Sequence, residues 1–139
     1  MRRCLGKTLA GYQEALDLAR PDDHTARGGR EHQLGVVYGR AGDVSQALTR
    51  YQRAIGHHEA AARPYAGGQA RFNIALLLAR AGRPAEGLTY ARAALDNFQQ
   101  TGPGGQPQAA TAARLVTDLT ALAAAQAAQE ATPAAPSAT

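Results

Sequence analysis

Apolar residues recur along the chain at the spacing of amphipathic helices. Each stretch carries an i, i+3, i+4, i+7 stripe, which predicts a helix with one buried face. In one stretch the stripe is Leu34, Val37, Tyr38 and Ala41, and in the next it is Ala47, Leu48, Tyr51, Ala54 and Ile55. The two stretches together predict a helical hairpin.

The hairpin pattern recurs at a fixed interval. Residues 33–42 align with residues 73–82 at an offset of 40, and the triplet Arg-Ala-Gly is identical in both. Residues 12–16 align with residues 51–55 at an offset of 39, so the chain opens with the second half of a further unit. Self-similarity at such a period is the signature of a repeat array.

Turn residues separate the expected helices. Gly42 and Gly82 follow the first helix of each unit, and Asp43 or Pro84 opens the second helix as an N-cap or first-turn residue. Proline and glycine predict turns between the units at 20–23, 57–68 and 101–107, and the middle stretch is also compatible with partial helix.

These boundaries divide the chain into one repeat domain and a short tail. Residues 1–130 form the domain, and the low-complexity residues 131–139, with two prolines, are expected to be disordered. The domain comprises a half repeat (8–20), two repeats (26–57 and 66–99) and a C-terminal capping helix (107–130). The half repeat leaves an apolar face without a hairpin mate, which suggests self-association or a longer parent protein.

Composition agrees with an all-α fold. Alanine makes up about a quarter of the chain, aromatic residues are only 5%, and tryptophan is absent. One cysteine, Cys4, excludes an internal disulfide framework and a cysteine-based zinc cluster. Neither a long apolar span nor a secretion signal is recognisable, so a cytoplasmic protein without membrane contact is expected.

The positions that repeat resemble those of the tetratricopeptide repeat (TPR) family over roughly residues 8–100. The match consists of a large apolar residue, a small one and a second large one in the first helix, then alanine, tyrosine and alanine in the second. In this chain these are Leu34 or Ile74, Gly35 or Ala75, Tyr38 or Leu78, and then Ala47, Tyr51 and Ala54.

This resemblance implies a right-handed superhelical array of antiparallel helical hairpins. A 40-residue unit is similar to the long repeats of kinesin light chains and of bacterial multidomain regulators, in which such arrays follow other domains. The second unit departs from the pattern, because Gly87 and Ala91 replace the expected alanine and aromatic residue. Packing alone accounts for these signature positions.

TPR arrays hold an extended peptide or a partner helix on the concave face, which implies a ligand groove here. By the helix phase of the family, the candidates are His32, Gln33, Val36, Arg40, Phe72, Asn73, Leu76 and Arg80. Side-chain amides donate and accept at once, as a peptide requires, and arginines fork onto carboxylates, so we expect an acidic or mixed peptide.

Two alternatives stand beside this groove interpretation. Asn73 and Gln33 could equally form hydrogen bonds to a neighbouring helix. Arg40 and Arg80 could simply be solvated side chains in the last turn of a helix, where the helix dipole favours a positive charge. The carboxylate clamp of co-chaperone TPRs is not expected, because His32 and Val36 occupy its basic and asparagine positions.

No catalytic motif or cofactor-binding sequence is present, so a non-catalytic protein-interaction or scaffold module is expected. His57, His58 and Glu59 are the only cluster of metal-ligand types, but adjacent residues point apart and no metal is predicted. The formal charge of +4 raises nucleic-acid binding as a lesser alternative. The arginines alternate with acids and few aromatics accompany them, which argues against it.

Overall fold

The computed structural model describes residues 2–131, with side chains from residue 8 onward, and this part of the chain is all-α as predicted. It contains no strand and no helix long and apolar enough to cross a membrane. The α-helices are α1 (Arg2–Leu18), α2 (His24–Arg40), α3 (Val44–Ala60), α4 (Pro64–Arg80), α5 (Pro84–Gln100) and α6 (Gln106–Ala131), with a 3₁₀ turn, η1 (Gly102–Gly105), before the last.

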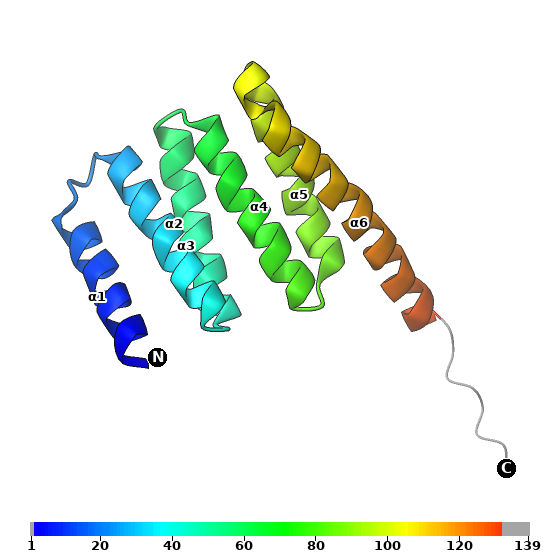
Figure 1. Ribbon diagram of the computed structural model, residues 1–139, viewed down its shortest axis with the longest axis horizontal. Helices are drawn as coiled ribbons and strands as arrows, with labels where there is room; N and C mark the ends of the chain where they lie inside the picture. Colours follow the sequence, from blue (N-terminus) through cyan, green and yellow to red (C-terminus); the bar gives the residue numbers. More distant parts are fainter. Residues whose placement is uncertain (1, 132–139) are drawn as a thin grey trace, which may run out of the picture.

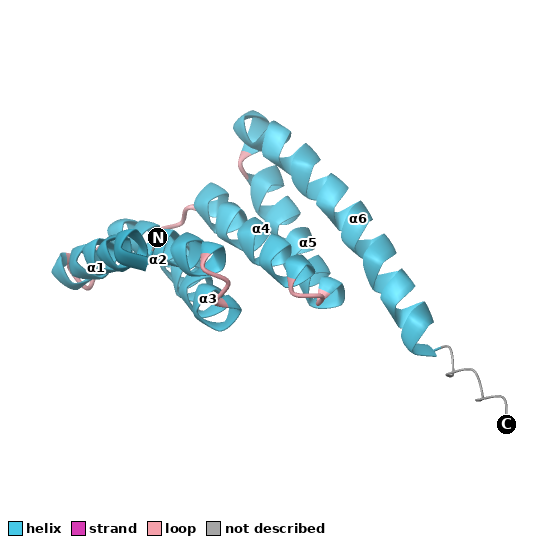
Figure 2. Ribbon diagram, turned by 60° about the horizontal axis from the view of Figure 1, so that its bottom comes forward, coloured by secondary structure: helices cyan, strands magenta, loops and turns pink. Residues whose placement is uncertain are grey.

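The helices pack side by side in chain order, with α1 at one end of the row and α6 at the other (Figure 1). The closest packing joins α2 to α3 and α4 to α5, and α6 packs along α5. The tilted view shows short loops within each pair (Figure 2). Successive antiparallel helices joined by such loops are helical hairpins, as the sequence predicts.

The turns within the hairpins use the predicted residues. Gly42 and Gly82 adopt positive φ values of 81° and 76°, a region that glycine enters without steric cost. Asp43 caps α3, because its Oδ1 accepts a hydrogen bond of 3.1 Å from the Gln46 amide. Pro84 occupies the first turn of α5, where its missing N–H costs nothing.

The predicted turn at 57–68 is mostly helical, which is the alternative that the sequence left open, and the turn itself is shorter. Helix α3 continues to Ala60 and α4 begins at Pro64, so Gly67 and Gly68 lie inside a helix. Gly68 is needed there for close approach, since a Cβ atom would lie 2.9 Å from Phe98 Cε1. In the short turn that remains, Ala62 takes the positive φ, at 54°.

The ends of the chain also differ from the expected bounds. Helix α1 begins at Arg2 rather than near residue 8, and α6 runs through Ala131. The rest of the tail expected to be disordered, 132–139, lies outside the described residues.

Small residues set the spacing of the helices in the core. Gly35 on α2 faces the ring of Tyr51 on α3, and a Cβ atom there would lie 2.7 Å from Tyr51 Cδ1. In the second hairpin the equivalent residues are Ala75 and Ala91, both fully buried, and Leu119 of α6 packs with them. The departure at Ala91 is therefore compensated by a methyl group at Ala75 and by a side chain from α6.

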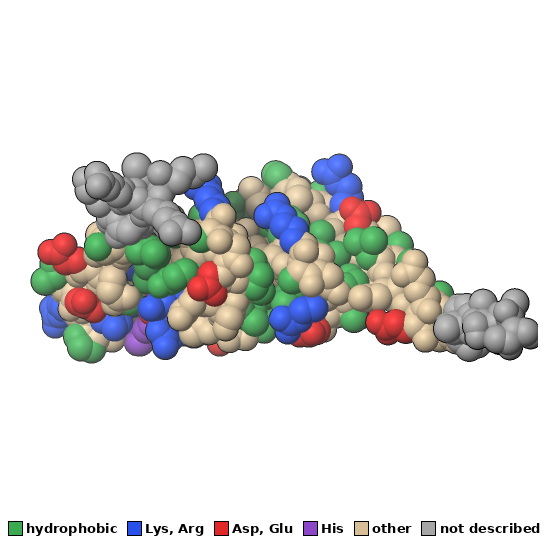
Figure 3. Space-filling view, turned by 90° about the horizontal axis from the view of Figure 1, so that it is seen from below, with side chains coloured by type: hydrophobic (Ala, Val, Ile, Leu, Met, Phe, Trp, Pro, Cys, Tyr) green, Lys and Arg blue, Asp and Glu red, His purple; other side chains and the backbone are tan. Residues whose placement is uncertain are grey.

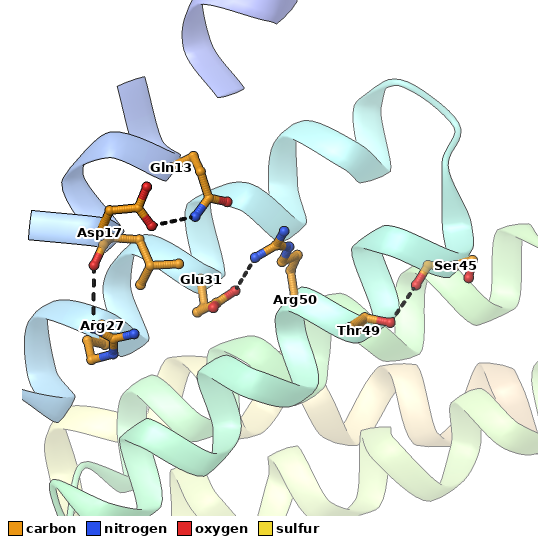
Figure 4. Close-up of polar contacts among 8 residues, drawn as sticks. Gln13, Asp17, Arg27, Glu31, Ser45, Thr49 and Arg50 are labelled. Carbon is orange, nitrogen blue, oxygen red and sulfur yellow. Dashed lines mark hydrogen bonds and ion pairs between the residues drawn. The ribbon is translucent and has the colours of Figure 1, made fainter. Parts of the chain in front are cut away.

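Polar contacts join the first three helices (Figure 4). Arg27 of α2 donates to the carbonyl oxygens of Leu16 and Ala19 at 3.4 and 3.1 Å, which satisfies acceptors at the C-terminal end of α1. Glu31, 4% exposed, pairs with Arg50 of α3 at 3.4 Å. A buried carboxylate needs such a partner.

Candidate functional site

Two cavities lie along the face that α2 and α4 share. The first, of about 600 Å³, is lined by polar and aromatic side chains of α2, α4 and the start of α6, including His32, Gln33, Gln69, Phe72, Asn73, Gln108 and Thr111. The second, of about 570 Å³, lies toward the C-terminal ends of α2 and α4 and includes Val36, Arg40, Tyr51, Leu76 and Arg80. Both volumes are within the range of roughly 300–1,000 Å³ typical of ligand sites.

The structure brings all eight residues proposed from the sequence to these cavities. Four of them line the first cavity, namely His32, Gln33, Phe72 and Asn73. The second is lined by Asn73 again, together with Val36, Arg40, Leu76 and Arg80. Asn73 borders both cavities, so they adjoin one another, and we name the face along which they lie the α2/α4 furrow.

Asn73 is held by a hydrogen bond across the furrow. Its Nδ2 lies 3.2 Å from His32 Nε2 on α2. Burial lowers the pKa of His32, which favours the neutral ring that accepts from Asn73. Burial likewise raises the pKa of Tyr51 and outweighs the opposing effects of Arg40 and Asn73. This bond to a neighbouring helix is the alternative role expected for Asn73, and it fixes the amide between the two cavities.

The charged side chains that line the furrow are all arginines. Arg63 borders the first cavity and Arg40 and Arg80 border the second, and none of the residues lining either cavity carries a carboxylate. All three arginines are exposed. Guanidinium groups bind carboxylates and phosphates through paired hydrogen bonds, so this furrow is suited to an anionic group.

Several cavity residues were missed by the sequence reasoning. His58 and Phe98 line the floor of the first cavity, and Gln108 reaches it from α6, which had been expected only to cap the array. One signal was available, since Phe98 follows His58 at the 40-residue offset. Both rings lie against a helical glycine, Gly28 for His58 and Gly68 for Phe98.

Two buried polar atoms at the first cavity have no hydrogen-bond partner among the described residues. They are Nδ1 of His58, which is 3% exposed, and Oε1 of Gln108. Burial, followed by the positive potentials of His32, Arg63 and His57, lowers the pKa of His58 to about 4. The ring is therefore neutral at pH 7.

His57 and His58 point apart, as expected for adjacent residues. His57 Nδ1 lies 3.0 Å from His24 Nδ1 of α2, whereas His58 packs against Gly28. The described residues contain no group of three or more histidine, cysteine, aspartate or glutamate side chains placed to hold a metal ion.

Charges of both signs are interspersed on the face drawn in Figure 3, without a continuous basic stripe. Nucleic-acid-binding surfaces gather their cations in a patch or stripe. Comparison of the chain with known protein families, curated proteins and solved structures found no match.

Proposed function

We propose that the chain is a non-catalytic protein-interaction module that holds an acidic segment of a partner in the α2/α4 furrow. The observation that carries the proposal is the furrow itself, which is lined by three arginines and by no carboxylate. In this proposal the hairpins form a right-handed TPR-like superhelix, and α2, α4 and α6 are its ligand-facing helices.

The dimensions of the furrow support a peptide rather than a small metabolite. The residues that line it on α4 extend from Ala66 to Arg80, which is roughly 21 Å of helix. A segment of about six or seven extended residues spans that length. Carboxamides of Gln33, Gln69 and Asn73 lie along it and offer donors and acceptors to peptide groups.

The test is a selection of displayed random short peptides with the full chain as bait. We expect the enriched peptides to carry net negative charge and to bind in calorimetry. Reversing Arg40 and Arg80 to glutamate is expected to weaken binding at least about tenfold, because a charge-assisted hydrogen bond contributes about 1.5–3 kcal/mol.

The matched control reverses two exposed arginines on the other helices of the hairpins, Arg53 of α3 and Arg92 of α5. It changes the net charge by the same amount and leaves the furrow intact. Enrichment of neutral or basic peptides, or equal losses in the two double variants, would contradict an acidic ligand in the furrow.

Self-association is a second candidate, favoured by apolar side chains at the ends of the row. Leu18 at the end of α1 is 79% exposed and Leu122 on α6 is 54% exposed. Sedimentation velocity over a wide concentration range tests it. A Leu18→Ser, Leu122→Ser variant is expected to sediment as a monomer where the wild-type chain forms a dimer, and a monomeric wild-type chain throughout contradicts it.

A further inference from the structure

A histidine pair at the open end of the α2/α3 hairpin lies apart from the furrow residues that carry the proposed function. His24 belongs to the first turn of α2 and His57 to the last turn of α3. Their Nδ1 atoms lie 3.0 Å apart, their ring centroids are 5.3 Å apart, and the ring planes are inclined by 32°. Two imidazoles from separate helices thus present the same nitrogen to one another.

From this geometry we propose that His24 and His57 together bind a divalent transition metal of square-planar preference, Cu²⁺ or Ni²⁺. Imidazole nitrogen is a preferred ligand of these ions. With metal–nitrogen bonds of about 2.0 Å, two nitrogens 3.0 Å apart subtend roughly 95° at the metal. That angle is near the right angle of square-planar coordination, whereas a tetrahedral ion requires nitrogens about 3.3 Å apart.

Binding requires two small changes in the pair. In the free protein one ring donates an Nδ1–H hydrogen bond to Nδ1 of the other. For metal binding that ring changes tautomer, its proton passing to Nε2 through solvent, so that both Nδ1 lone pairs become available. Each ring also turns so that its lone pair points to the metal beside the Nδ1–Nδ1 line. Both residues are partly exposed, so water can reach the remaining coordination positions.

The surroundings of the pair determine how tightly the ion is held. Burial lowers the pKa of His57, and the positive potentials of His24 and Arg27 lower it further, whereas Glu31 raises it. Because Glu31 is itself paired with Arg50, an ion at the pair is held by coordination rather than by a surplus of negative charge. With two protein ligands and water completing the coordination, the site is open and exchangeable rather than a closed structural site. Its occupation ties the start of α2 to the end of α3 and stabilises this hairpin.

The experiment titrates Cu²⁺ into the full chain in a non-coordinating buffer and follows the ion by calorimetry and electron paramagnetic resonance. All proteins carry Cys4→Ser, which removes the one thiol. The expected result is one ion per chain, hyperfine splitting from two nitrogens, and a raised unfolding temperature. In His24→Gln and in His57→Gln, affinity falls at least about tenfold and the rise in unfolding temperature disappears.

Glutamine retains hydrogen-bonding capacity between the helices, and equal ellipticity at 222 nm verifies that each variant is folded. A spectrum that reports a single nitrogen, or an affinity unchanged in either variant, overturns the site. Because no substituted residue lines the α2/α4 furrow, peptide binding in these variants separates this proposal from the proposed function.

Discussion

The fit between Gly35 and Tyr51 gives the sharpest test of how this array packs. In Gly35→Ala the new methyl group meets the ring at 2.7 and 2.8 Å, and the ring is held by His32 on its edge, with centroids 5.4 Å apart. Overpacking costs roughly 1–3 kcal/mol, and the helix propensity of alanine returns about 1 kcal/mol. The substitution is therefore expected to destabilise the chain by about 1 kcal/mol.

The sign of this effect reverses once the ring is removed. Tyr51→Ala alone is expected to cost about 3–5 kcal/mol, because Tyr51 is buried and its loss leaves a cavity. In that background Gly35→Ala no longer meets the ring, resembles the Ala75 and Ala91 pair of the second hairpin, and stabilises by about 1 kcal/mol. The coupling between the two sites is thus about 2 kcal/mol.

The assay is urea unfolding, followed by ellipticity at 222 nm, of the wild-type chain, the two single variants and the double variant, which together form a double-mutant cycle. Trimethylamine oxide is added equally to all four so that the tyrosine variant remains folded. A Gly35→Ala effect of the same sign and size in both backgrounds would refute the reasoning, because the glycine would then not be required by the ring.

Three further predictions test single contacts. Ala62→Gly is expected to stabilise by up to about 1 kcal/mol in thermal melts, since φ is 54° there, and a lower melting temperature contradicts this. The pKa of His58 is lowered to about 4, so between pH 6.5 and 4 the unfolded chain binds a proton that the folded chain does not. The free energy of unfolding is therefore expected to fall by about 2 kcal/mol over this range, less than the roughly 3 kcal/mol of the full shift because the ring borders an open cavity. His58→Phe should flatten this slope in urea titrations. Glu31→Gln should lower the free energy of unfolding by about 2 kcal/mol, because it leaves Arg50 without its charge partner. Glu86→Gln, which breaks an exposed pair, should change nothing measurable. Equal effects of the two substitutions would count against the buried pair.

Hydrophobic periodicity predicted the helices because every hairpin buries one stripe. The glycines located the turns at Gly42 and Gly82, where the backbone adopts a positive φ. The turn expected at 57–68 was drawn too long because Gly67 and Gly68 were taken as helix breakers. Gly68 instead allows close packing against Phe98. A glycine required by a neighbouring ring and a glycine required by a turn look alike in one sequence.

The candidate site was predictable only as far as the repeat extends. The helix phase implied by the TPR resemblance placed eight residues on one face, and the structure brings them to the two cavities. The contribution of Gln108 was not predictable, because it depends on how α6 folds back against α5 after the 3₁₀ turn. His24 and His57 are 33 residues apart in sequence, and their pairing depends likewise on how α2 packs against α3.

The most direct measurement of the central claim is a nuclear magnetic resonance titration of the ¹⁵N-labelled chain with a selected acidic peptide. The side-chain amides of Gln33, Gln69 and Asn73 report the furrow separately from the backbone. The account predicts that these signals and the backbone amides of α2 and α4 shift together and saturate at one peptide per chain. Shifts confined to α3 and α5, with the three side-chain amides unmoved, would contradict it.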